Sequence, residues 1–180
     1  MTDRWRRESS HPRGDYRVFR VREDTYSHPA VQDERSYFVI EAPDWANVVA
    51  LTPAGEVVLV TQFRQGVAAV RLEIPGGIVE AGEVPAVAAV RELREETGYV
   101  GAAPELLCVV EPNPALQDNR CWTFVVRDAR PVDAPAGDSD EVLRVELCAL
   151  TDLRARVSAG EVPHALIQLA LLRFLANCDD

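Results

Sequence analysis

The stretch that decides the fold runs from Gly76 to Tyr99 and reads GGIVEAGEVPAVAAVRELREETGY. Its first part is a loop rich in glycine, and its second part has the periodicity of an amphipathic helix. Pro85 is compatible with the first turn of such a helix, and Gly98 stands where a glycine commonly ends one. The stretch therefore predicts a loop, a helix over about 83–97 and a stop.

Three carboxylates of the predicted helix lie on one face. Glu92, Glu95 and Glu96 are spaced i, i+3 and i+4, and like charges placed so closely repel each other. Mg²⁺ and Mn²⁺ prefer oxygen ligands, and Mg²⁺ is usually held by one or two carboxylates plus substrate phosphates and waters. The face is therefore a candidate half-site that a diphosphate would complete. The three glutamates alone leave a solvated acidic helix face as the alternative.

The whole stretch has the spacing G-x5-E-x7-R-E-U-x-E-E-x-G-U, in which U is a bulky apolar residue. In this form it resembles the signature box of the Nudix hydrolases, although an aromatic residue replaces the usual aliphatic one at the last position. Agreement over so many positions makes chance a poor explanation. The matching residues are Gly77, Glu83, Arg91, Glu92, Leu93, Glu95, Glu96, Gly98 and Tyr99.

The resemblance implies hydrolysis of a nucleoside diphosphate linked to another moiety, by attack of water on phosphorus. Mg²⁺ is the implied cofactor, and Mn²⁺ can substitute for it. Glu92 and Glu96 are the implied metal ligands, together with the backbone carbonyl of Gly76. Glu95 is then an additional ligand or a base that orients water, and Arg91 is expected to orient the carboxylates.

A second candidate for the catalytic base lies outside the box. In enzymes that resemble this chain, the base can come from a glutamate on a separate loop. By position that residue is Glu141, just before a strand expected over 143–150. Acidic residues in surface loops are usually solvated, so both Glu141 and Glu95 are retained as candidates.

Segments that precede the box indicate a branch of the family. Gln62-Phe63-Arg64 and the sequence LEIPGG over 72–77 resemble the corresponding segments of ADP-ribose pyrophosphatases. The resemblance implies that Arg64 binds a diphosphate oxygen and that Glu73 accepts a hydrogen bond from an adenine or ribose group. The alternative for Arg64 is an ordinary arginine on a surface strand.

A proline beyond the box points to the same branch. Pro114 follows Tyr99 at a spacing typical of ADP-ribose and nucleoside-diphosphate-sugar pyrophosphatases, which makes it a candidate substrate-binding residue. A glycine usually follows this proline, whereas Ala115 stands here. Another nucleoside diphosphate sugar therefore remains open beside ADP-ribose. In either case the products would be a nucleoside monophosphate and a sugar phosphate.

Two other functions stay open. One is a Nudix hydrolase that acts on nucleoside triphosphates, including oxidised ones. The other is a non-catalytic nucleotide-sensing Nudix domain, which the intact glutamates of the box disfavour.

The composition limits the partners. A hydrophobic content of 47% in 180 residues suffices for one core. The net charge of −10 disfavours nucleic acid polymers, because their binding depends on basic residues that neutralise phosphates. Without a membrane-length apolar run or a secretory signal, the sequence predicts a cytoplasmic protein with no membrane partner. The four cysteines lack zinc-binding spacing and are expected to be buried thiols.

The rest of the chain predicts an α/β (α+β) fold. Residues 1–15 are polar and are expected to form a mobile tail. Strands are expected over 16–22, 36–40, 47–52, 56–64, 71–75, 105–111, 120–127 and 143–150, and further helices over 152–160 and 163–176.

The resemblance refines this organisation. It implies a Nudix-like α/β/α sandwich around a mixed sheet over 46–178, preceded by an N-terminal β-rich segment. It also implies a homodimer in which the strands of residues 16–45 reach the partner.

Overall fold

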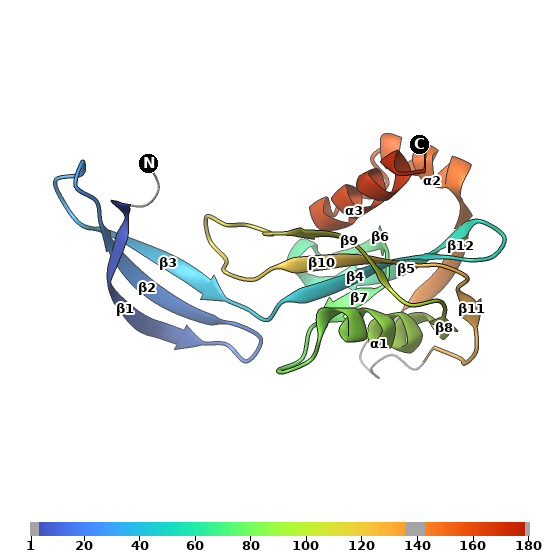
Figure 1. Ribbon diagram of the computed structural model, residues 1–180, viewed down its shortest axis with the longest axis horizontal. Coiled ribbons are helices and arrows are strands. Elements are labelled where there is room, and N and C mark those ends of the chain that lie inside the picture. The colour runs from blue at the N-terminus through green and yellow to red at the C-terminus, as the bar shows by residue number, and fades with distance from the viewer. Residues whose placement is uncertain (1–3, 136–142, 179–180) are drawn as a thin grey trace. The chain divides into compact units, whose positions relative to one another are not determined.

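The computed structural model describes residues 4–135 and 143–178. The chain divides into two units (Figure 1). The first unit combines the chain up to Pro43 with Glu111–Arg120. The second unit holds Asp44–Val110 and the chain from Cys121 onward, so it contains the Nudix-like box.

The first unit is built on a three-stranded antiparallel sheet in the order β1-β2-β3. Its strands are β1 (Arg6–Asp15), β2 (Arg20–Ser27) and β3 (Arg35–Glu41). The separate segment joins this unit by backbone hydrogen bonds, from Ile40 N to Leu116 O at 2.8 Å and from Asp118 N to Ile40 O at 3.3 Å. Among the described residues of this unit, no apolar side chain is buried.

Strand β1 replaces the tail that the polar sequence of residues 1–15 suggested. Its backbone pairs with β2 along its length, and polar groups bind across the strands. The fully buried Asp24 accepts hydrogen bonds from Ser10 Oγ at 2.6 Å and from Arg22 Nε at 3.0 Å. Arg22 also contacts Asp118 Oδ2 at 2.5 Å. Polar pairing therefore orders a segment that has no apolar periodicity.

The second unit contains a seven-stranded mixed sheet, in which β4 and β10 pair in parallel and the other pairs are antiparallel. The central order is β12-β5-β4-β10-β9, with β6 beside β5 and β7 beside β4. The strands are β4 (Trp45–Leu51), β5 (Glu56–Arg64), β6 (Ala69–Glu73), β7 (Gly76–Ile78), β9 (Glu105–Val110), β10 (Cys121–Val126) and β12 (Arg144–Ala149). A short pair joins β8 (Tyr99–Val100) to β11 (Arg130–Pro131).

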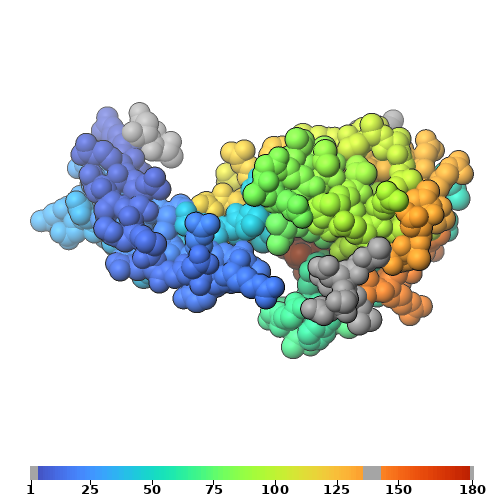
Figure 2. Space-filling model, turned by 90° about the horizontal axis from the view of Figure 1, so that it is seen from below, coloured from blue at the N-terminus to red at the C-terminus, as the bar shows by residue number. Residues whose placement is uncertain are grey.

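Helices cover both faces of this sheet, which confirms the predicted α/β/α arrangement (Figure 1). Helix α1 (Pro85–Thr97) packs on one face and lies toward the viewer in Figure 2, in green. Helices α2 (Leu150–Ser158) and α3 (Ala165–Ala176) pack on the other face. In the described parts of the chain, no helix combines the length and apolar character needed to cross a membrane.

Alternation of side chains along the central strands supplies both cores. Val48 and Ala50 of β4 face α1, whereas Val49 between them faces α3, as the two-residue period of a strand requires. Ala88, Ala89 and Leu93 of α1 are fully buried, so the side of the helix that carries them packs against the sheet.

The cysteines follow the prediction with one exception. Cys108, Cys121 and Cys148 are buried, whereas Cys178 is exposed. Cys178 lies just beyond the last turn of α3, where the chain has already left the core.

Candidate active site

Two glycines bring α1 close to the backbone of β7. A Cβ atom on Gly76 would lie 2.5 Å from Ala46 O, and one on Gly77 would lie 2.5 Å from Glu92 Cδ. Contacts this short are not tolerated between real atoms. Gly76 therefore leaves room for the backbone of β4, and Gly77 leaves room for the flexible carboxylate of Glu92, which lies directly against it.

Glu96 ties the helix to the same strand. Its side chain is buried, and its Oε2 accepts a hydrogen bond from Gly76 N at 2.9 Å. Burial of an ionised carboxylate is costly unless donors compensate it. The bond holds Glu96 in a defined orientation against the backbone N–H of Gly76.

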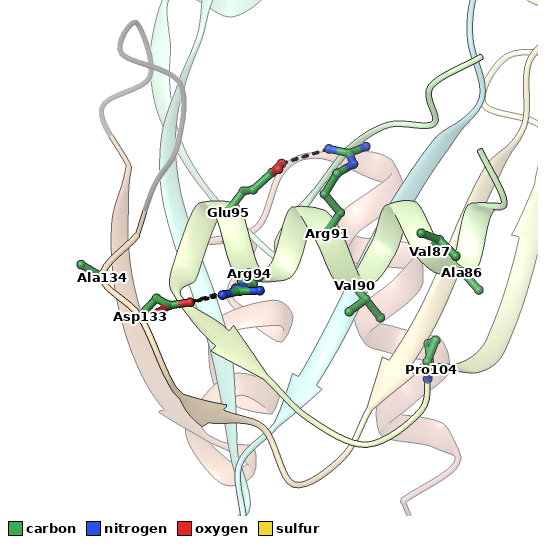
Figure 3. A pocket seen from close by; sticks show the side chains of 9 residues that line it. All are labelled: Ala86, Val87, Val90, Arg91, Arg94, Glu95, Pro104, Asp133 and Ala134. Carbon is green, nitrogen blue, oxygen red and sulfur yellow. Dashed lines mark hydrogen bonds and ion pairs between the residues drawn. The ribbon is translucent and has the colours of Figure 1, made fainter. Parts of the chain in front are cut away.

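Arg91 lies among the remaining carboxylates of the box. It donates twice to Glu83, at 3.0 Å each, and its Nη1 contacts Glu92 at 2.7 Å and Glu95 at 3.0 Å. Figure 3 shows the contact with Glu95. Its Nη2 also donates to Ile78 O at 3.0 Å.

These hydrogen bonds shift the pKa values of Arg91 and Glu83. Hydrogen bonds to Glu83 raise the pKa of Arg91, and the bonds to Glu92 and Glu95 add to this effect against partial burial. In turn, Arg91 and the N–H of Glu80 lower the pKa of Glu83. The repulsion expected between neighbouring glutamates is thus balanced by one shared arginine.

The donor set around α1 suits a divalent cation. In the portion of the chain that the structure describes, no three His, Cys, Asp or Glu side chains converge as a ready-made metal cage. Mg²⁺ does not require one, because it is usually held by one or two carboxylates together with phosphates and waters. Glu92 and Glu96 on one helix face, beside the Gly76 backbone, provide donors of this kind.

Arg64 and Glu73 are brought together at a second location. Glu73 is 1% exposed, and its two oxygens accept from Arg64 Nε at 2.9 Å and Arg64 Nη2 at 2.5 Å. His164 Nδ1 lies 3.3 Å from Glu73 Oε1. Burial alone would raise the pKa of Glu73, but the bonds from Arg64 and His164 outweigh it and lower that pKa to about 2.

The other predicted site residues lie elsewhere. Pro114 is an exposed turn residue of the first unit, and Glu141 falls outside the described residues. Sequence reasoning did not single out His164, which directly precedes α3 and belongs to no motif. The structure is what reveals its proximity to Glu73.

A pocket of about 880 Å³ runs along α1 (Figure 3), and Glu92 and Glu96 do not line it. Val87 and Val90 line it, and the pair formed by Arg94 and Asp133, at 2.6 Å, borders it. Among the residues that match the spacing of the box, Arg91 and Glu95 line this pocket. The lining of this pocket is mainly apolar and does not include Glu92 or Glu96, the proposed metal ligands. The pocket is therefore distinct from the carboxylate cluster.

Comparisons with known proteins identify the family. The model of the NUDIX domain matches residues 41–167. The chain belongs to the Nudix family.

Two relatives and one solved structure in the comparisons are similar to this chain. The chain is 30% identical over 134 residues to an ADP-ribose pyrophosphatase of Bacillus subtilis, covering 74% of this chain and 72% of that protein. It is 39% identical over 121 residues to the ADP-sugar pyrophosphatase of Mus musculus, covering 62% and 54% of the two chains. A crystal structure of an ADP compounds hydrolase shares the fold, with a TM-score of 0.86 at 19% identity and coverage of 98% and 95%.

Proposed function

We propose that this protein is a Mg²⁺-dependent pyrophosphatase that hydrolyses ADP-ribose or another nucleoside diphosphate sugar. The products are a nucleoside monophosphate and a sugar phosphate. The observation that carries the proposal is the carboxylate cluster of α1, in which Glu96 is bonded to Gly76 N and Arg91 holds Glu83, Glu92 and Glu95. Nudix hydrolases generally depend on a divalent metal ion, and Mn²⁺ can replace Mg²⁺ in this role.

Metal binding, proton transfer and positioning are assigned to different residues. Glu92, Glu96 and the carbonyl of Gly76 hold the metal ion. When bound, the ion neutralises charge on the diphosphate and lowers the pKa of a coordinated water. Glu95, which is half exposed, or Glu141 accepts the proton of the attacking water. Arg91 acts as a positioning residue, because it contacts carboxylates on both sides of the cluster.

Substrate recognition is assigned to residues outside the box. Arg64 contacts a phosphate oxygen with its guanidinium group, which the bidentate pair with Glu73 holds rigid. Glu73 therefore acts on the substrate mainly through Arg64. Pro114 is retained as a candidate substrate-binding residue because of its spacing from the box. The two pyrophosphatase relatives, which act on ADP-ribose and ADP-sugars by name, support this choice of substrate.

The proposal includes a homodimer formed through residues 16–45. The three-stranded sheet buries no apolar side chain of its own among the described residues, and it exposes Tyr37 by 48% and Phe38 by 59%. Neighbouring strand residues point to opposite faces, so both faces present an aromatic ring. A second copy would cover them. Phe38→Asp is expected to yield monomers in light scattering after size exclusion, whereas Leu172→Asp, an exposed change on α3, leaves the dimer intact.

The decisive experiment is a product analysis. The protein is incubated with Mg²⁺ and a panel of nucleotide sugars and nucleoside triphosphates, and the products are identified by mass. ADP-ribose is expected to give AMP and ribose 5-phosphate, and Glu96→Gln is expected to suppress both. Release of inorganic pyrophosphate from a triphosphate, without cleavage of any nucleotide sugar, would favour the triphosphate hydrolase instead.

A further inference from the structure

A second pocket, of about 440 Å³, lies in the second unit between the β5–β6 loop and the start of α3. We call it the cationic pocket and define it by Arg64, Arg71, Glu73 and His164, with the short 3₁₀ turn Gln65–Val67 beside them. The surface around this turn is blue-green in Figure 2. The carboxylates of α1 do not line this pocket.

The charged groups that line this pocket are two arginines and one glutamate. The glutamate is already neutralised, since Arg64 binds both of its oxygens. The charge of Arg71 is therefore left in excess. Arg71 Nη1 donates a hydrogen bond to Val70 O at 3.1 Å, and within the described residues Arg71 makes no ion pair with a carboxylate. Such a local excess is notable in a chain of net charge −10.

The floor of the pocket is polar and fixed. Glu73 is 1% exposed and binds Arg64 through both of its oxygens, so the Arg64 side chain cannot easily swing away, and His164 Nδ1 lies 3.3 Å from Glu73 Oε1. Groups held in this way form hydrogen bonds to an anion with little loss of conformational freedom. A guanidinium group recognises the oxygens of a phosphoryl group through paired bonds.

The pocket is also near the proposed reaction centre. Glu73 and Gly76 are three residues apart, so their Cα atoms lie within about 11 Å of each other. Gly76 is the residue whose N–H binds Glu96. The floor of the pocket and the glycine loop of the box are therefore close together along the chain.

We propose that the cationic pocket binds, through Arg71, a phosphoryl group other than the diphosphate that is cleaved, to which Arg64 is assigned. This group is either a further phosphate on the substrate, such as one on a ribose hydroxyl, or free inorganic phosphate. The first source rests on the function proposed above. Phosphate binding itself does not depend on that function.

The binding test uses inorganic phosphate and a signal inside the pocket. The chain has three histidines, and the NMR signal of His164 is assigned with a His164→Gln variant. Titration of the metal-free protein with phosphate is expected to shift the His164 signal in a saturable manner, while His11 and His28 stay unmoved. Arg71→Ala is expected to weaken this binding about tenfold, as loss of a charge-assisted bond implies.

The matched control is Arg173→Ala, which removes the same charge from an exposed position on α3. It is expected to titrate like the wild type. An unmoved His164 signal would overturn the proposal. So would an Arg71→Ala variant that binds phosphate as tightly as the wild type.

A kinetic comparison then identifies the source of the phosphoryl group. If the substrate carries it, the wild type prefers ADP-ribose 2′-phosphate over ADP-ribose by about tenfold in kcat/KM, and Arg71→Ala abolishes this preference. If free phosphate is the ligand, added phosphate changes the rate with ADP-ribose in the wild type but not in Arg71→Ala. Cleavage of neither substrate, together with an intact phosphate titration, would contradict the proposed function and leave the pocket assignment standing.

Discussion

The carboxylate of Glu92 occupies the space that a side chain at Gly77 would need, since a Cβ there would lie 2.5 Å from Glu92 Cδ. The close approach of Glu92 therefore explains why position 77 of the box is a glycine. Gly77 does not have a left-handed φ, so its requirement is one of room rather than of backbone conformation.

Gly77→Ala is accordingly expected to impair activity more than stability. The added methyl group must displace a flexible carboxylate, which breaks its contact with Arg91 but leaves the core intact. We expect kcat/KM to fall at least about tenfold, in line with losses seen when groups that orient metal ligands are removed. Steady-state kinetics at several Mg²⁺ concentrations, with a melting curve, would check this. A large fall in Tm with unchanged kcat/KM would contradict it.

Glu96→Gln tests the metal assignment. The amide oxygen can still accept the bond from Gly76 N, so the fold is retained while the ligand charge is lost. We expect kcat to fall at least about a hundredfold, because charge at the metal site stabilises the transition state directly. Glu105→Gln, an exposed change on β9, should keep full activity. Wild-type turnover of Glu96→Gln with Mg²⁺ would refute the assignment.

Gly98→Ala tests the end of α1. Gly98 has φ +74°, and a Cβ there would lie 2.9 Å from the carbonyl carbon of Asp133, which is backbone and cannot move away easily. Gly160 has φ +78° with nothing near its missing Cβ, so it isolates the cost of the left-handed conformation. We expect Gly160→Ala to cost about 1 kcal/mol and Gly98→Ala clearly more in urea unfolding. Equal losses would show that the contact with Asp133 is unimportant.

Glu73 predicts a specific pH dependence of stability. Its pKa is lowered from 4.5 to about 2. Its ionised form therefore stabilises the fold fully above pH 4.5, and this contribution is lost as the pH falls from 4.5 toward 2. The contribution is roughly 3 kcal/mol by linkage. In melting curves between pH 2 and 6, the wild type should lose Tm more steeply than Glu73→Gln, and the two should converge at low pH. Parallel curves would count against the buried ion pair as a source of stability.

The sequence predicted the local parts of this structure best. Helix α1, its end at Gly98 and the shared face of its glutamates follow from spacing within one turn or two, so they could be derived without tertiary contacts.

Contacts between distant segments could not be derived in this way. Arg64 and Glu73 were singled out separately, and their pairing became visible only when β5 and β6 were placed side by side. His164 lies beside Glu73 although the two are 91 positions apart in the sequence, and no sequence motif includes His164. Strand β1 was missed because polar cross-strand pairs around Asp24 order it, whereas sequence patterns report mainly apolar periodicity.

The division of the chain into two units also bears on how such a protein can change during evolution. Glu111–Arg120 leaves the second unit after β9 and returns to it as β10, yet its backbone pairs with Ile40 of β3. Recombination at Pro43 would therefore separate Ile40 from Leu116 and Asp118 and leave the β9–β10 connection without its partners. The N-terminal sheet therefore cannot be exchanged alone. A gene that acquires a new N-terminal sheet must also acquire a β9–β10 connection that pairs with it.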